Sequence, residues 1–117
     1  MLNNTVLVGR LVRNPELKET ENGKKVLSAT LAVPRSFKNL EGEYETDFIN
    51  VDIWNQVAEN TAEYCKKGDL IGIKGRLESD SFEKDGKKEY RMKVVAERVT
   101  FLSQKRETKS NDNRIER

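Results

Sequence analysis

The sequence predicts an all-β domain in which five strands close into a small barrel, with one short helix between the third and fourth strands. Three observations lead to this prediction. Apolar and polar side chains alternate in several short stretches, which is the period of a half-buried β-strand. Glycines fall inside these stretches, where strongly bent strands need them. One stretch, residues 56–67, has the apolar spacing of a helix instead.

The third predicted strand, residues 46–54, shows the alternation most clearly. One of its faces is a row of β-branched side chains suited to a core, made by Ile49, Val51 and Ile53. The opposite face is polar in its middle but carries Phe48 and Trp54 near its ends. Such rings can be half-exposed strand residues, part of a subunit interface, or a platform on which unpaired bases stack. This strand alone leaves all three interpretations open.

The first two strands are predicted at residues 4–12 and 26–35. Both faces of the first are partly apolar, so we expect the core to cover one face and a second subunit the other. Gly9 indicates a bulge or a sharp bend there. The second strand has one apolar face and one face of small hydroxyl residues, and Pro34 marks its end.

A loop is predicted at residues 35–45. Phe37 lies between Arg35 and Lys38, and this interleaving of a ring with positive charge is typical of single-strand binding. The alternative is that Phe37 folds back onto the core.

The helix predicted at residues 56–67 has Asn55 as its N-cap and ends at Gly68. The fourth strand, residues 69–79, and the last, residues 88–102, are joined by a hairpin with the turn signal Asp85-Gly86. The predicted order is three strands, then a helix, then two strands. This is the order of a five-stranded Greek-key barrel of the OB type (OB-fold), which has its helix between the third and fourth strands.

Composition excludes several classes of function. The 117 residues are 36% charged and 35% hydrophobic, which fits one domain with a small core. The chain has no histidine and one cysteine, so it lacks the usual general base, ordinary zinc ligands and an internal disulfide. No phosphate-binding glycine loop occurs. We therefore expect no enzyme, no cofactor and no metal. No apolar run could span a membrane and no leader opens the chain, so we expect a cytoplasmic protein.

Several motifs occur in one register over about residues 1–102. They are Leu7-Val8-Gly9-Arg10-Leu11, Asn14-Pro15-Glu16, Ala32-Val33-x-Arg35-Ser36-Phe37, Phe48-x-Asn50-Val51-x-x-Trp54, Ala58-Glu59-x-x-x-x-Tyr64-Cys65-Lys66-Lys67-Gly68 and Ile73-x-Gly75-Arg76-Leu77. Together they resemble the bacterial single-stranded DNA-binding proteins.

The resemblance implies an OB-fold over residues 1–102 that binds single-stranded DNA with little sequence preference. It also implies a nucleoid-associated homotetramer acting in DNA replication, recombination, repair or uptake. Bases would stack on four aromatic positions, which here are Phe37, Phe48, Trp54 and Phe82. Eight cations are candidates for phosphate contacts: Arg10, Arg35, Lys38, Lys74, Arg76, Lys84, Lys87 and Lys88. Arg35 and Arg76 are the best candidates because they lie within the motifs.

The chain departs from the family pattern in three places. Glu78-Ser79-Asp80-Ser81 precedes Phe82 where the family usually carries basic residues, and Pro34 replaces a polar residue. Residues 103–117 are polar and without periodicity, so we predict a disordered tail. That tail has five basic and three acidic residues, whereas the family's replicative members end in an acidic segment that recruits other enzymes. The pattern fits a short accessory form, a form carried by a mobile element, or a shortened chain.

Other functions stay open beside single-strand binding. An OB-fold module could bind structured RNA or a priming complex. A protein-interaction scaffold would bury the outer rings against a partner. A hydrolase would have to use carboxylates alone, and no close Asp/Glu pair lies in a recognisable site.

Overall fold

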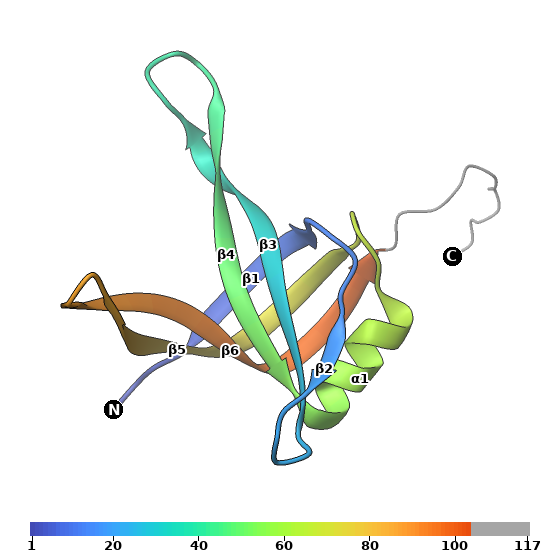
Figure 1. Ribbon diagram of the computed structural model, residues 1–117. Coiled ribbons are helices and arrows are strands. Elements are labelled where there is room, and N and C mark those ends of the chain that lie inside the picture. The colour runs from blue at the N-terminus through green and yellow to red at the C-terminus, as the bar shows by residue number, and fades with distance from the viewer. Residues whose placement is uncertain (104–117) are drawn as a thin grey trace, which may run out of the picture.

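The computed structural model of the protein describes residues 1–103, and one helix and six strands lie in that range (Figure 1). In chain order these elements are β1 (Thr5–Leu11), β2 (Leu17–Glu19), β3 (Lys25–Lys38), β4 (Tyr44–Trp54), α1 (Asn55–Tyr64), β5 (Leu70–Lys84) and β6 (Lys87–Ser103). Nearly all of the tail predicted at 103–117 lies outside the described residues.

The strands close into a barrel. Their order is β1-β5-β6-β4-β3, and β1 also pairs with β3 through Arg10 and Leu11, which joins the two ends of the ring. The β4–β6 pair is parallel and the other pairs are antiparallel. The prediction of an all-β, five-stranded OB-type barrel with a helix before the fourth strand is confirmed. The short β2, which pairs only with β3, was not predicted.

The core follows the alternation seen in the sequence. Its largest fully buried apolar side chains come from β3, β4, β5 and β6: Leu27, Leu31, Val51, Ile53, Ile71, Ile73 and Val94. Gly9 lies where β1 crosses from β5 to β3, and a Cβ there would lie 2.7 Å from the carbonyl oxygen of Ala32. A glycine is needed at this position because the two backbones approach so closely.

Helix α1 packs on β3 and β4 and buries Ala58 and Thr61. The predicted bounds were wrong at both ends. Trp54 stays extended and takes the N-cap position without a side-chain cap, while Asn55 turns the chain into the helix with φ 58°. The helix ends at Tyr64 because the next turn is stabilised differently: the buried Asp69 carboxylate accepts a 2.9 Å bond from the backbone N–H of Lys66.

The predicted loop at residues 35–45 is mostly strand. β3 continues to Lys38, which pairs with Tyr44, and the register shifts between Pro34 and Lys38. The tip is closed by the Asn39 side chain, which accepts bonds from the backbone N–H groups of Glu41 (2.9 Å) and Glu43 (3.0 Å). Residues 34–46 therefore form an ordered arm, the β3–β4 arm, that projects from the barrel (Figure 1).

A second projection is the β5–β6 hairpin, residues 79–92 (Figure 1). Its turn residues Asp85 and Gly86 have φ of 53° and 77°, the two positive φ values that a type I′ hairpin turn requires. The Asp85-Gly86 turn prediction is confirmed. All side chains from Ser81 to Met92 are exposed, so this hairpin has no buried face within the chain.

Candidate nucleic-acid interface

The candidate interface is the outer face of β3 and β4, formed by Ser28, Thr30, Ala32, Phe48, Asn50, Asp52 and Trp54. Phe48 is 67% exposed and lies opposite the small Ala32, so one side of its ring is open. Trp54 is half-buried. Because Phe48 and Trp54 alternate with the core residues of β4, the core fixes where both rings lie.

The strip between the two rings is polar and internally bonded. The Ser28 hydroxyl donates to the Asp52 carboxylate at 3.1 Å, and the Thr30 hydroxyl donates to the Asn50 side-chain oxygen at 3.2 Å. Both bonds run between directly paired residues of β3 and β4. The outer face is therefore a polar surface whose side chains are held by cross-strand hydrogen bonds, with an aromatic ring toward each end.

The other two predicted rings lie on the projections. Phe37 is 66% exposed on the β3–β4 arm, and Phe82 is 38% exposed on the β5–β6 hairpin. The possibility that Phe37 folds onto the core is wrong, because the extra length of β3 carries it away from the barrel. The guanidinium carbon of Arg91 lies 5.2 Å from the Phe82 ring centroid, so one side of that ring already carries a cation–π contact.

Arg35, a favoured candidate for a phosphate contact, is held by two carboxylates. Its guanidinium lies 2.9 Å from Asp47 and 3.0 Å from Glu45. The hydrogen bond and charge of Asp47 raise the pKa of Arg35, and the same hydrogen bond lowers the pKa of Asp47. A phosphate would have to displace these partners.

Arg76, the other favoured candidate, is paired in the same way. It lies 2.8 Å from Glu78 and 3.2 Å from Glu97, and hydrogen bonds to both raise its pKa. Lys74 shares Glu97 at 3.4 Å. The pairs with Glu97 could not be read from sequence alternation, because they depend on the register of β5 against β6. Arg76 and Glu78 lie two residues apart on one face of β5.

The remaining predicted cations are less constrained. Arg10 donates to the backbone carbonyl of Gly68 at 2.9 Å. Lys38 lies over the Tyr44 ring at 5.6 Å and Lys88 over the Tyr90 ring at 5.9 Å. Lys84 and Lys87 are exposed and lie opposite each other in the β5–β6 ladder, beside the hairpin turn.

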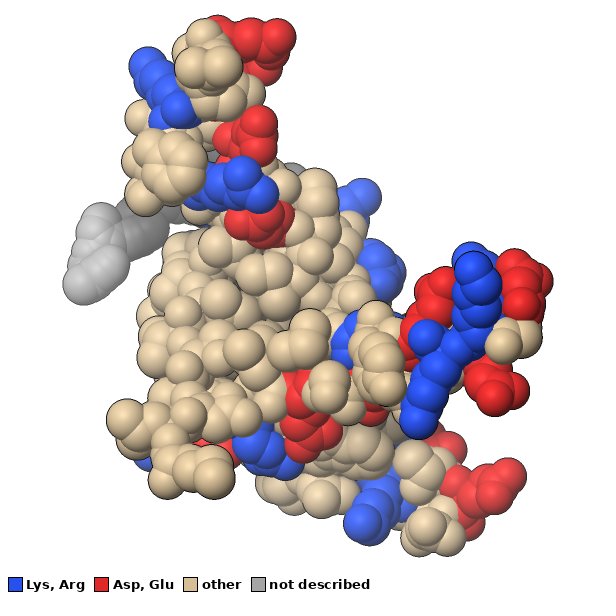
Figure 2. Space-filling view, turned by 90° about the vertical axis from the view of Figure 1, so that its left-hand side faces the viewer, with Lys and Arg blue, Asp and Glu red and all other residues tan. Residues whose placement is uncertain are grey.

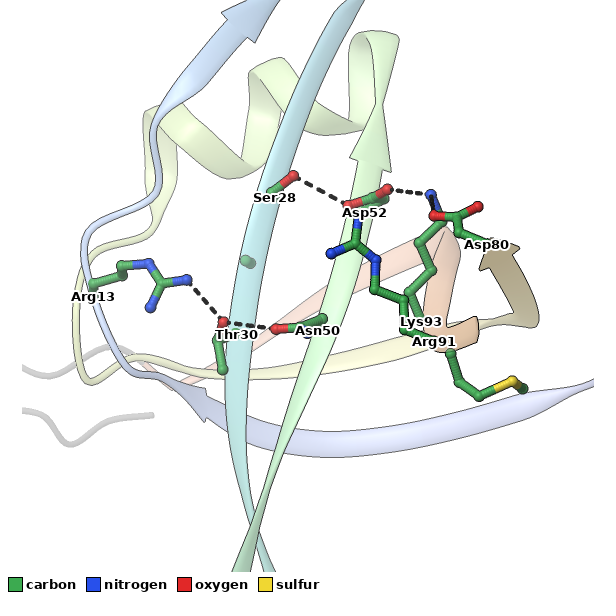
Figure 3. Close-up of a pocket in the computed structure, with 10 residues that line it drawn as sticks. Arg13, Ser28, Thr30, Asn50, Asp52, Asp80, Arg91 and Lys93 are labelled. Atoms are coloured by element: carbon green, nitrogen blue, oxygen red, sulfur yellow. Dashed lines mark hydrogen bonds and ion pairs between the residues drawn. The ribbon is translucent and has the colours of Figure 1, made fainter. Parts of the chain in front are cut away.

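Three further cations, which sequence analysis missed, lie around a hollow on the outer face (Figure 3): Arg13, Arg91 and Lys93. Lys93 bridges Asp52 at 2.9 Å and Asp80 at 3.2 Å, and these hydrogen bonds raise its pKa. Glu78 and Asp80, the two carboxylates that precede Phe82 in the sequence, are thus both paired with cations. Arg91 and Lys93 alternate with Tyr90, Met92 and Val94 in the sequence, and that was the signal available for them.

Charge is mixed on the face of the molecule that Figure 2 shows. Figure 2 shows basic and acidic side chains close together on the parts that project from the molecule, with a broad uncharged area over the body between them. Within residues 1–103, no group of three or more His, Cys, Asp or Glu side chains is arranged to hold a metal ion. None of the described helices has the length and apolar character to cross a membrane.

The closed barrel, the helix before its fourth strand and the rings on its outer face define an OB-fold domain with an open binding face. Residues 2–102 match the model of the Single-strand binding protein family, and the chain belongs to this family.

Three similar proteins illustrate the relationship. The chain is 45% identical over 113 residues to Single-stranded DNA-binding protein B of Bacillus subtilis (strain 168), covering 96% of this chain and 100% of that protein. It is 52% identical over 103 residues to a Single-stranded DNA-binding protein of Bacillus cereus, covering 87% of this chain but 61% of that relative. The crystal structure of a deletion mutant of the single-stranded DNA binding protein from Thermus aquaticus superposes with a TM-score of 0.73 at 32% identity, covering 87% of this chain and 51% of that chain.

Proposed function

We propose that the protein binds single-stranded DNA with little sequence preference, mainly by stacking bases on the rings of Phe37, Phe48, Trp54 and Phe82. The observation that carries this proposal is the 67% exposure of Phe48 on a sheet face fixed by the core beneath it. Stacking contributes about 1–3 kcal/mol per base and is indifferent to base identity, because every base has a π-face. Family membership and the single-stranded DNA-binding relatives support the same function.

Phosphate contacts add the second, salt-dependent part of the affinity. Those candidate cations without a carboxylate partner among the described residues are Arg10, Lys38, Lys84, Lys87 and Lys88. Arg35, Lys74 and Arg76 contribute only where a phosphate displaces Asp47, Glu45, Glu78 or Glu97. With so many cations already paired, stacking should carry more of the affinity than it does in a strongly basic binder.

We also propose that the chain assembles as a homotetramer. Val6 is 74% and Val8 47% exposed on the outward side of β1, and Leu102 is 47% exposed on β6. A second subunit covering this side would bury apolar surface that the single chain leaves open. The mass in solution tests this, since a tetramer has four times the 13.5 kDa mass of the chain. A monomeric mass at binding concentrations would contradict it.

The cellular role that follows is the protection of single strands in the cytoplasm, at the nucleoid, during replication, recombination, repair or DNA uptake. Recruitment of other enzymes through the tail is not part of the proposal.

The direct test is anisotropy of labelled oligo-dT and of a duplex of equal length. We expect binding of the single strand in strong preference to the duplex. Phe48→Ala should weaken oligo-dT binding, and the matched variant Phe48→Tyr, which keeps a ring, should restore most of it. Equal affinity for both DNAs would favour a structured-RNA or priming module, and no binding of either would favour a protein-interaction scaffold.

A further inference from the structure

The hollow on the outer face lies where DNA would cross between the ring positions of β4. It measures about 230 Å³ and is floored by Thr30, Asn50 and Asp52. Asn50 and Asp52 are the two outward residues between Phe48 and Trp54. Arg13 reaches it from the connection after β1, and Arg91 reaches it from β6 on the other side (Figure 3). The two guanidinium groups point toward one another across the outer face.

Some of the charged side chains around the hollow are ion-paired and others are not. Lys93 bridges both carboxylates, Asp52 and Asp80, in a single network that keeps one net negative charge. Within residues 1–103, neither Arg13 nor Arg91 forms an ion pair with a carboxylate. Arg13 donates one bond to the Thr30 hydroxyl at 2.9 Å, and Arg91 stacks on Phe82. Three cations against two carboxylates leave the lining with a net positive charge.

We propose that Arg13 and Arg91 form a clamp for an internucleotide phosphate of single-stranded DNA, an inference that rests on the proposed function. A guanidinium carries five N–H donors in a planar fork that matches phosphate geometry. Arg13 uses one of its donors on Thr30, so others remain for a ligand. Because both arginines line the same hollow, a phosphate held there would have guanidinium donors on either side.

The position of the clamp fits a strand that also stacks on the rings. Asn50 is two residues from Phe48, or about 7 Å along the strand. Arg91 contacts Phe82 directly, so a phosphate held by Arg91 is adjacent to that ring as well. The clamp would therefore hold the backbone between a base on β4 and a base on the β5–β6 hairpin.

This assignment differs from the one that sequence motifs favour. Arg35 and Arg76 each have two carboxylate partners within 3.2 Å, and a phosphate gains little by replacing one anion with another. Arg13 and Arg91 have no such competitor. The salt-dependent part of the affinity should therefore depend more on the clamp than on either motif arginine.

Titration of oligo-dT with Arg13→Gln, Arg91→Gln and the double variant, between 0.1 and 1 M salt, tests the clamp. On single strands one phosphate contact contributes a slope of about 0.7, or about fivefold in affinity per tenfold change in salt. We expect the affinity of each single variant for oligo-dT to fall about fivefold at low salt, and its salt slope to fall by about 0.7. Lys66→Gln, at an exposed cation after α1 and outside the hollow, is the control and should change the affinity less. Arg35→Gln compares the clamp with a motif arginine and should also cost less affinity than either clamp variant.

Because Arg91→Gln also removes the contact with Phe82, a second probe separates the two effects. An oligo-dT with neutral methylphosphonate linkages has no phosphate charge for the clamp. On this probe the difference between wild type and Arg13→Gln should disappear, and Arg91→Gln should keep only the loss that comes from its contact with Phe82. If wild type binds oligo-dT but the variants match it in affinity and slope, or if the Arg13→Gln loss persists on the neutral probe, the clamp is wrong while single-strand binding stands. If wild type does not bind oligo-dT, the proposed function itself fails.

Discussion

The guanidinium of Arg35 lies 2.9 Å from the carboxylate of Asp47, a contact between β3 and β4 at the base of the β3–β4 arm. Glu45 lies at 3.0 Å from the same guanidinium. The arm also carries the exposed Phe37. Its central cation is thus neutralised before any DNA arrives, while its ring remains available for stacking.

Removing these two carboxylates should strengthen DNA binding. In Asp47→Asn/Glu45→Gln the Arg35 charge becomes available to a phosphate, so we expect affinity for oligo-dT to rise about fivefold at low salt and the salt slope to steepen by about 0.7. Adding Arg35→Gln to this variant should abolish the gain. A carboxylate variant that binds no more tightly than wild type at 0.1 M salt would show that Arg35 does not face DNA.

The link between Lys93, Asp52 and Asp80 should stabilise the base of the β5–β6 hairpin. Lys93 and Asp52 have side chains only 22% and 18% exposed, so Lys93→Met leaves a half-buried carboxylate unpaired. We expect a loss of about 1 kcal/mol in the free energy of unfolding, measured by chemical denaturation. Lys84→Met, at the exposed hairpin tip, is the control and should be nearly neutral. Equal stability of the two variants would argue against the link.

Gly75 should tolerate no side chain. A Cβ at this position would lie 2.1 Å from the backbone oxygen of Val95, at the register shift between β5 and β6. We expect Gly75→Ala to cost about 3 kcal/mol, the upper range for overpacking. Gly72→Ala, in the same strand with its nearest neighbour at 3.5 Å, should change stability by less than about 0.5 kcal/mol. A small effect of Gly75→Ala on the free energy of unfolding would mean that the two strands can move apart without loss of stability.

Cys65 should make stability fall at alkaline pH. Burial, and then the charge of Asp69, raise its pKa from 9.0 to about 11. A group whose pKa is raised on folding contributes stability that is complete below its unfolded pKa and is lost as the pH rises through the folded value. Between pH 8 and 10 we expect wild type to lose about 1 kcal/mol more than Cys65→Ala. Parallel pH profiles for the two proteins would contradict this.

The barrel could be predicted from the sequence because its strands have one buried face. Ile49, Val51 and Ile53 alternate with polar residues, and the structure buries Val51 and Ile53 fully. The β3–β4 arm was missed because both its faces are exposed, so its residues show no alternation, and Pro34 suggested an end. Asn55 was expected to cap the helix, but the left-handed turn it makes is set by the path from β4 into α1.

The positions of Phe48 and Trp54 on the outer face of β4 were also predictable, because aromatics on a polar strand face stand out. Which cations are already paired with carboxylates could not be predicted. Whether Arg35 or Arg13 is available depends on which residues lie across from it, and the contact of Arg35 with Asp47 on the neighbouring strand has no local signal in the sequence. Arg13 and Arg91 come from segments far apart in sequence that meet only when the barrel closes.

The central claim, that bases stack on the rings of the outer face, is tested most directly by the fluorescence of Trp54, the chain's single tryptophan. Titration with oligo-dT should change its emission saturably, with the same midpoint that anisotropy of the labelled oligonucleotide gives, because a base comes to lie against the ring. Unchanged emission at concentrations where anisotropy shows saturated binding would mean that DNA passes elsewhere.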